Sequence, residues 1–539
     1  MAANFLYFDR QDHELLFMVN KILEQEPGMA LMKPLFDPSL HPNGIKQMSI
    51  SRELRVAYAV VNLLTSLEDG QLSDRLRALQ SLRDEVLYTG ADSFRRNTGR
   101  VLIQIMKDLV RAYGHTRRQL MLAHDFMRAS TGNPRIIRGM LRRYHLLEMP
   151  EDWSQLSFDD HVHDAHTKGR KTSTHLIMDA WIKGIRSLTV IYYNYVEEAA
   201  ARELLQAAAI MGMDVRIGVE FNAGFRDKMV QFIWVPTGFA GVDAFIEFLQ
   251  SAAVAKLMRE GQTVSCYREN IVRDLLENFN RVHRERINAY FKVDLPVLNR
   301  EEFEVFVGPG QASRLHLAEF IHRELAGVFD GRLNELRDEF AAADAAGCKA
   351  INGLVDEMNM LDPETILERW LVPSANPGIN DPDSPVLDED SPALLKHSVH
   401  TLVDLVAGLR ANYECILTLS GLTVEDILEI LYDCEGRVTH LEMFNLKEYT
   451  RGCSPYLKEV CALRQAVNEG SVIALKRIIR ASLGAMRAAP EADEARCAKF
   501  TRILKDIPRL QSFYATSPLQ ASLGSDSTGR SHRLLGMGL

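Results

Sequence analysis

The stretch "FDDHVHDAHTKGRKTS", residues 158–173, brings three histidines into six positions at the end of a predicted strand. The histidines are His161, His163 and His166, and acidic residues flank them on both sides. Side chains at positions i and i+2 of a strand face the same side, so His161 and His163 are expected to point together. The pattern fits a strand end that binds a metal, and it also fits a polar loop that is rich in histidine.

Strands and helices alternate along the chain that follows this stretch. Further strands are predicted in "IRSLTVIYYN", "MDVRIGVEFN", "YECILTLSG", "VTHLEMFN" and "LQASLGSDSTG". Alternation with helices predicts parallel βα units. We therefore expect one parallel, barrel-like sheet with strands that end near residues 163, 192, 220, 419, 444 and 526. Ligands of such folds bind at the C-terminal ends of the strands, where the acids Glu220, Glu442 and Asp526 fall.

The rest of the chain divides by its periodicity. Residues 1–150 carry apolar residues at helical spacing and predict an all-α N-terminal domain, and residues 151–539 are assigned to the barrel. Residues 240–400 are predicted to be a mostly helical excursion from the barrel. Within it, the Pro- and Asp-rich stretch 372–395 is predicted to be an exposed loop or linker.

A basic segment lies in the predicted N-terminal domain. Residues 95–143 hold twelve lysines and arginines against two acids. This segment is either a solvated helical face or a surface for phosphate-rich partners such as nucleic acid, or for an acidic protein.

Composition limits the function classes. The net charge of −9 over 539 residues argues against a protein that coats nucleic acid over its whole surface. No apolar run is long enough for a membrane-spanning helix, so no membrane association is expected. The seven cysteines are never spaced C-x-x-C, which argues against a disulfide framework or a zinc ribbon. We find no signal peptide, and a cytoplasmic location is expected.

The order of the motifs resembles the polymerase and histidinol phosphatase (PHP) family, from about residue 156 to the end of the chain. "DDHVHDAH" is similar to the family's first motif, D-x-H-x-H, and "GVEF" to its G-x-E motif. "GQASRLHLAEFIHREL" resembles the R-x-H pattern of its helical insertion, and "LGSDSTG" its last motif, S-D-x-H. The resemblance implies a distorted TIM-like (βα)7 PHP barrel, a fold whose members usually bind two or three metals and hydrolyse phosphoesters.

Several family positions are changed in this chain. Tyr193, Gln231 or a neighbour, Leu419 and Thr528 stand where the family usually has metal-binding histidines. The resemblance therefore implies a ligand set of His161, His163, Glu220 and Asp526. Such a set suits one divalent metal, Zn²⁺, Mn²⁺ or Fe²⁺, rather than three. His166 is an alternative local ligand, and Glu220 and Asp526 could instead be salt-bridged carboxylates.

Basic residues follow the first barrel strand. Lys168, Arg170 and Lys171 are expected either to bind the phosphate oxygens of a substrate or to lie in a solvated loop. Arg314 and His316 of the R-x-H pattern are expected to pack within their helix. No general base is assigned, because the family's additional histidines are absent.

Three functions remain open from the sequence. The first is a metal-dependent phosphoesterase with a divergent active site, acting on a small phosphorylated molecule. The second is a catalytically degenerate barrel that serves as an interaction or regulatory module. The third is a metal hydrolase of C–N bonds, although its usual later-strand histidines and carbamylated lysine have no clear counterpart. Only "RSHRLLGMGL" follows the last strand, so a protein partner or a missing C-terminal segment is expected to cover that strand.

Overall fold

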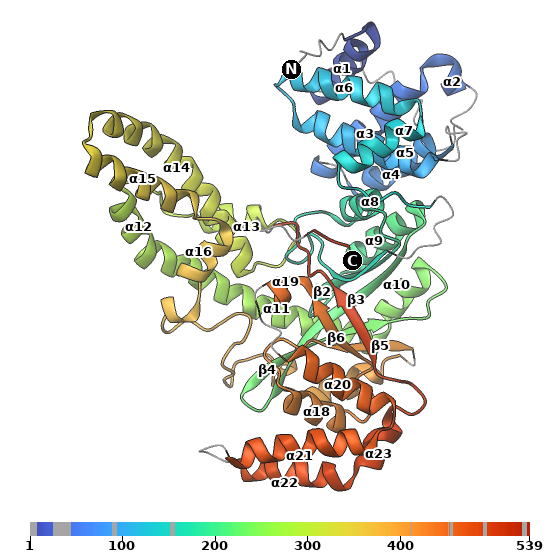
Figure 1. Cartoon of the computed structure of the whole chain (residues 1–539), viewed down its shortest axis with the longest axis vertical. Helices are drawn as coiled ribbons and strands as arrows, with labels where there is room; N and C mark the ends of the chain where they lie inside the picture. Colours follow the sequence, from blue (N-terminus) through green and yellow to red (C-terminus); the bar gives the residue numbers. More distant parts are fainter. Residues whose placement is uncertain are drawn as a thin grey trace.

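Seven strands form a nearly closed barrel in the computed structural model, in chain order from β1 to β7 (Figure 1). The structure describes residues 8–24, 45–69, 71–88, 94–150, 157–410, 412–450, 452, 456–488, 493–530 and 536–538. The strands are β1 Phe158–Val162, β2 Ser187–Tyr193, β3 Asp214–Phe225, β4 Lys228–Pro236, β5 Tyr413–Leu417, β6 His440–Asn445 and β7 Gln520–Gly524. Five of the six predicted strand ends lie within two residues of the observed ones.

The expectation of an all-parallel sheet is wrong at β4. This strand is antiparallel to both β3 and β5, whereas the other neighbouring pairs are parallel. Only Arg226 and Asp227 separate β3 from β4, and Arg226 has a φ of 57°. Such a short connection can only form a hairpin, because a parallel pair needs a crossover of a dozen or more residues. The same hairpin carries β3 on to Phe225, beyond its predicted end near residue 220.

Branched aliphatic side chains fill the barrel interior. Ile191, Ile233, Val235 and Ile416 form a buried cluster contributed by β2, β4 and β5. Gly218 of β3 faces this cluster, and a Cβ atom there would stand 2.7 Å from Ile191 Cδ1. The interior is therefore a packed core, and it leaves the strand ends above it for polar residues.

The barrel closes between β1 and β7. The Asp526 amide donates to the carbonyl of His161 at 2.8 Å, and the His163 amide donates to the carbonyl of Ser527 at 3.0 Å. Gly524 makes the approach sterically feasible, because a Cβ atom there would lie 2.3 Å from His161 Cβ. Strand β1 and the residues that end and follow β7 are thus joined at the histidine stretch.

Every described element before residue 151 is a helix. These helices are α1 Arg10–Leu23, α2 Ile45–Ser49, α3 Arg52–Asp69, α4 Leu72–Tyr88, α5 Arg95–Arg111, α6 Thr116–Ser130 and α7 Pro134–Arg143. Helices α4 and α5 pack on the first barrel helices, α8 Ser173–Lys183 and α9 Glu198–Met211. Buried side chains of both regions belong to one apolar cluster, so the domain boundary near residue 150 stays a prediction.

The basic segment 95–143 is only partly a surface. Arg117, Arg118 and Arg142 are exposed. Arg100 is fully buried, where it donates to the carbonyl of Ile182, and Lys107 is 6% exposed. Some of these basic side chains therefore bind the N-terminal helices to the barrel. Binding of nucleic acid by the exposed ones stays a prediction.

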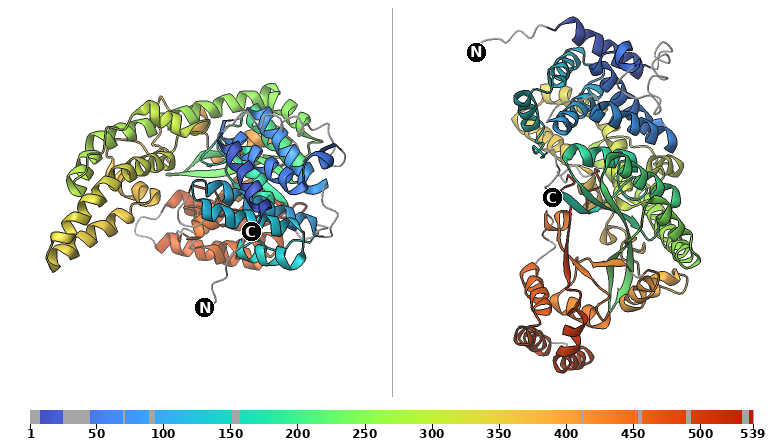
Figure 2. Two further views of the ribbon diagram at one scale, coloured as in Figure 1. Left: turned by 90° about the horizontal axis from the view of Figure 1, so that it is seen from above. Right: turned by 90° about the vertical axis from the view of Figure 1, so that its right-hand side faces the viewer.

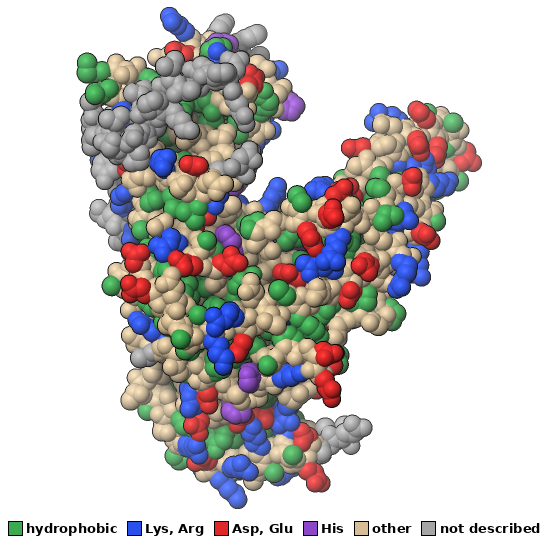
Figure 3. Space-filling view, turned by 180° about the vertical axis from the view of Figure 1, so that it is seen from behind, with side chains coloured by type: hydrophobic (Ala, Val, Ile, Leu, Met, Phe, Trp, Pro, Cys, Tyr) green, Lys and Arg blue, Asp and Glu red, His purple; other side chains and the backbone are tan. Residues whose placement is uncertain are grey.

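The predicted excursion is helical and forms an arm that projects from the barrel (Figure 2). Its elements are α10 Val242–Gln250, α11 Ala252–Asn278, the π-helical turn η3 Phe279–His283, α12 Arg284–Phe291, α13 Arg300–Val307, α14 Arg314–Ala342, α15 Ala345–Asn359 and α16 Pro363–Trp370. Helix α11 starts beside the barrel and leads into the arm. The outer part has an apolar core of its own, and its surface mixes acidic and basic side chains (Figure 3).

The stretch 372–395 is anchored rather than freely exposed. It contains only the short turns η4 Pro373–Ala375 and, at its end, η5 Ala393–Lys396. Asn376 is 1% exposed and hydrogen-bonds to Asn278. Arg314 forms ion pairs with Asp381 and Asp383, so this loop returns to the arm near the barrel.

The chain returns to the barrel after this loop and adds a second helical layer. Its helices are α17 Val399–Ala407, α18 Val424–Asp433, α19 Leu446–Thr450, α20 Leu457–Asn468, α21 Val472–Ala488, α22 Glu494–Lys505 and α23 Ile507–Phe513. Residues 536–538 lie against the start of the barrel, where the Gly538 amide donates to Asp159. Within the described part of the chain, no helix has the length and apolar character needed to cross a membrane.

Candidate metal centre

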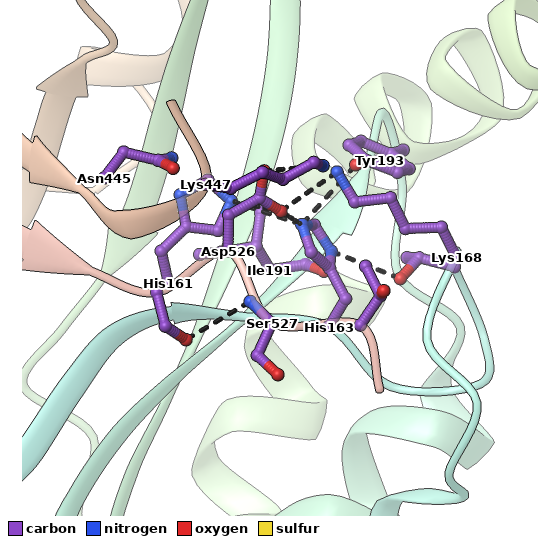
Figure 4. A network of polar contacts seen from close by, with 12 residues as sticks. His161, His163, Lys168, Ile191, Tyr193, Asn445, Lys447, Asp526 and Ser527 are labelled. Carbon is purple, nitrogen blue, oxygen red and sulfur yellow. Dashed lines mark hydrogen bonds and ion pairs between the residues drawn. The ribbon is translucent and has the colours of Figure 1, made fainter. Parts of the chain in front are cut away.

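Two imidazoles at the end of β1 and one carboxylate after β7 meet at one end of the barrel (Figure 4). His161 and His163 are 3% and 1% exposed, and Asp526 is 8% exposed. Asp526 follows β7 in a left-handed backbone conformation with a φ of 50°. An aspartate tolerates this conformation better than most residues, and here it directs the carboxylate toward the histidines.

The ligand atoms of these three side chains converge. His161 Nε2 lies 3.2 Å from His163 Nε2, and His163 Nε2 lies 3.2 Å from Asp526 Oδ1. The third separation, from His161 Nε2 to Asp526 Oδ1, is 4.0 Å. Among the described residues, these three form the one group of potential ligands that lie within 4.8 Å of one another.

The other ring nitrogens fix which way the imidazoles face. His163 Nδ1 donates to the backbone carbonyl of Ile191 at 2.9 Å, and His161 Nδ1 donates to Glu442 Oε1 at 2.6 Å. Each Nδ1 therefore carries the proton, which leaves Nε2 as the ligand atom of both rings. Carboxylate or carbonyl acceptors behind a histidine orient and strengthen metal ligands in this way.

The two imidazoles differ in their pKa values. Burial lowers the pKa of His161, but Glu442, with Asp526 and Glu220, outweighs burial and raises that pKa to about 9. Burial, with the nearby charge of Lys168, lowers the pKa of His163 to about 3. In this state His161 Nε2 carries the proton and donates to His163 Nε2 at 3.2 Å.

Asp526 lies between two ammonium groups. Lys168 Nζ is 3.1 Å from Asp526 Oδ1, and Lys447 Nζ donates to Asp526 Oδ2 at 3.0 Å. Burial raises the pKa of the Asp526 carboxyl, but the two lysines and His163 together hold it well below its usual value. Oδ1 nevertheless has no partner with hydrogen-bond geometry among the described residues. This oxygen is therefore paired electrostatically with Lys168, but it keeps lone pairs that no hydrogen bond uses.

The three side chains fit one divalent metal. Tetrahedral sites with ligand distances of about 2.1 Å place neighbouring ligand atoms roughly 3.4 Å apart, which lies between the two 3.2 Å separations and the third of 4.0 Å. Two imidazoles and a carboxylate suit Zn²⁺, Mn²⁺ or Fe²⁺. If bound here, the metal would be held by His161, His163 and Asp526.

The other predicted site residues lie in different places. Glu220 is 4% exposed in β3 and interacts electrostatically with the site, but it lies outside the group of three. His166 contacts Asp164 at 3.4 Å instead of joining the cluster. Lys168 is at the site, whereas the Arg170 side chain is exposed and Lys171 forms an ion pair with Asp179 of α8.

Two residues at the site were missing from the predicted set. Glu442 was noted as an acid at a strand end but was not assigned, and its position behind His161 makes it a supporting carboxylate. Lys447 was not considered, although it follows the strand-end motif "HLEMFN" by two residues. That spacing at the end of a parallel strand is a signal that could have identified it. Tyr193 also reaches the site, with its hydroxyl 3.4 Å from His163 Nε2.

No protein-family model matches the chain, and no curated protein matches it. Among solved structures, a candidate metal-dependent phosphoesterase from Bifidobacterium adolescentis is 12% identical, over 70% of this chain and 90% of that one, with a TM-score of 0.38. An amidohydrolase from Chromobacterium violaceum, with bound sulfate and no metal, is 16% identical, over 58% and 84%, with a TM-score of 0.35. At these values neither similarity identifies a function, so the assignment rests on the geometry of the site.

Proposed function

We propose that the barrel is a metal-dependent hydrolase of phosphoesters, with one divalent metal held by His161, His163 and Asp526. The observation that carries this proposal is the convergence of two Nε2 atoms, 3.2 Å apart, with a buried carboxylate oxygen that lacks a hydrogen bond. The likeness of the strand-end motifs to the PHP family supports the same chemistry.

The surrounding charges favour a phosphoester over a neutral substrate. A divalent metal would polarise a phosphoryl oxygen and lower the pKa of a bound water. Glu442 holds the His161 ring in position through Nδ1. Lys168 and Lys447 place two positive charges beside Asp526, where they can contact the negatively charged oxygens of a phosphoryl group. Glu220 is assigned an electrostatic role at the same rim.

The alternative is a degenerate barrel that serves as an interaction module. One observation favours it, because Lys168 and Lys447 already neutralise Asp526 without any metal. Since the two functions differ in whether a metal binds, metal content separates them directly.

The deciding experiment is elemental analysis of the protein after incubation with Mn²⁺ or Zn²⁺ and removal of free metal. We expect close to one equivalent in the wild type, hydrolysis of a generic phosphoester such as p-nitrophenyl phosphate, and loss of that activity with a chelator. His161→Ala/His163→Ala should lose both properties. His166→Ala is the matched control from the same stretch and should keep them. Less than about a tenth of an equivalent in the wild type, with no activity, would favour the interaction module.

A further inference from the structure

Lys168 and Lys447 reach Asp526 from two different parts of the barrel. Lys168 lies in the loop after β1, and Lys447 lies in α19, directly after β6. Their side chains are 15% and 19% exposed, so both ammonium groups are largely removed from water. Each one contacts a different oxygen of the same carboxylate (Figure 4).

The carboxylate of Asp526 has the surroundings of a ligand that bridges two cations. Oδ1 faces the two histidines, as it would face a metal, while Lys168 and Lys447 occupy the remaining directions. In two-metal hydrolytic centres, a second cation about 4 Å from the first supplies positive charge beside the substrate. Here the ammonium groups of Lys168 and Lys447 supply that positive charge in place of a second metal ion.

Lys168 is held in place independently of Asp526. Its ammonium group lies 5.0 Å from the centre of the Tyr193 ring, which provides a cation–π contact. This contact holds the ammonium group beside Asp526 Oδ1, the oxygen that faces the histidines.

We propose that Lys168 and Lys447 are built-in counter-cations of Asp526, which compete with a divalent metal for its carboxylate and take the place of a second metal ion. This inference rests on the proposed metal site. A metal that binds Oδ1 must share an oxygen that is already 3.1 Å from a positive charge, and this weakens its binding. The same lysines keep the carboxylate buried and in position before the metal arrives.

The test is the metal affinity of Lys168→Met/Lys447→Met, measured by calorimetric titration with Mn²⁺. We expect this variant to bind Mn²⁺ about tenfold more tightly than the wild type or better, because the competing charges are gone. Its melting temperature should also rise more on addition of Mn²⁺ than that of the wild type, because the unpaired Asp526 then depends on the metal.

The matched control is Lys228→Met. Lys228 Nζ lies 2.9 Å from the buried carboxylate of Asp426, so this variant removes a lysine–aspartate ion pair outside the metal centre. Its Mn²⁺ affinity should equal that of the wild type. If the double variant does not fold, Lys447→Met alone leaves Lys168 on Asp526 and should still bind about threefold more tightly than the wild type.

Each outcome separates this inference from the proposed function. Tighter binding in the lysine variants supports both. Binding in the double variant but none in the wild type would overturn the hydrolase and the role of the lysines as a second cation, and it would keep only their competition with the metal for Asp526. Equal affinity in the wild type and the lysine variants would overturn the inference alone. Binding by none of the proteins would overturn both.

Discussion

Two aspartates in this protein are each held between two lysines beside a histidine, and they form different kinds of site. Asp526 lies at the strand ends with Lys168, Lys447 and His163. Asp179 lies in α8 with Lys107, Lys171 and His175. Both carboxylates have pKa values well below the usual range of aspartate, in spite of their burial.

The two sites differ in how many nitrogen and oxygen atoms with free lone pairs face one point. At Asp526, two imidazole nitrogens and one oxygen without a hydrogen bond face a common point. At Asp179, as at Asp526, each carboxylate oxygen contacts a lysine, but only a single imidazole is nearby, 3.7 Å away. Lys107 comes from α5, so the Asp179 cluster attaches the N-terminal helices to the barrel. The same residue types thus give a binding site in one place and a structural attachment in the other.

The largest expected effect is a loss of folding stability when the Asp179 cluster is changed. Asp179→Asn removes the carboxylate from two lysines, and Lys107 is only 6% exposed. Loss of one partner from a buried ion pair typically costs about 3–5 kcal/mol. We expect a loss of this size in urea unfolding, with unchanged metal affinity per folded molecule. A loss of metal binding that equals that of the His161/His163 variant would show that the two clusters are not separate.

The reciprocal substitution, Asp526→Asn, should reverse this pattern. Metal affinity should fall by about 100-fold or more, because the only carboxylate among the three ligands becomes an amide. The cost in stability should be about 1–2 kcal/mol, since both lysine side chains, at 15% and 19% exposed, keep more contact with water than Lys107 at 7%, and asparagine tolerates the positive φ of 50°. Calorimetric titration and urea unfolding measure the two effects. A stability loss as large as that of Asp179→Asn would assign Asp526 to the scaffold.

The sequence predicted six of the seven strands, and β4, which is antiparallel to its neighbours, was not among them. Local alternation and turn signals located the ends of β1, β2, β5, β6 and β7, because these features are short-range properties of the chain. The direction of β4 depends on a two-residue turn, Arg226 and Asp227, which lacks the usual glycine or asparagine signal.

The sequence predicted only some of the residues at the site. His161 and His163 share a strand, so their spacing alone predicted that they face one side. The position of Glu220 depends on the stagger between strands, which the sequence does not contain, and it lies outside the group of three. Lys168 and Lys171 are three residues apart in one loop, yet they pair with aspartates of different elements, Asp526 after β7 and Asp179 in α8. No local pattern distinguishes these two lysines.

A smaller effect is expected from the residue behind the metal ligand. Glu442→Gln keeps the shape of the side chain but replaces the carboxylate that accepts from His161 Nδ1 at 2.6 Å. Loss of such a supporting acceptor commonly weakens metal binding by about 10–100-fold. Titration with Mn²⁺ should show this shift. Glu203→Gln is the matched control, because Glu203 is also a buried carboxylate but pairs with Arg75 outside the site. Equal affinities in the two variants would mean that Glu442 does not support His161.

The smallest expected effect is a change in folding stability on acidification, caused by His175 of the Asp179 cluster. Burial is the main cause that lowers the pKa of His175 from its usual 6.5 to about 4, and Lys171 and Lys107 oppose the attraction of Asp179. Between these pH values the unfolded chain binds a proton that the folded protein does not, so stability is lost as the pH falls from about 6.5 to about 4. With the side chain 26% exposed, we expect about 1–2 kcal/mol from this residue.

His175→Gln should remove this part of the pH dependence. Urea unfolding of both proteins at pH 7 and pH 4.5 provides the measurement, and the acid-sensitive carboxylates common to both cancel in the difference. The wild type should therefore lose more stability than His175→Gln over this interval. Equal losses would mean that the His175 imidazole is already protonated in the folded state. In that case the Asp179 cluster would hold three cations around one carboxylate, as the Asp526 site does with Lys168, Lys447 and His161, whose pKa is about 9. The two sites would then differ only in the second imidazole, that of His163, which remains neutral.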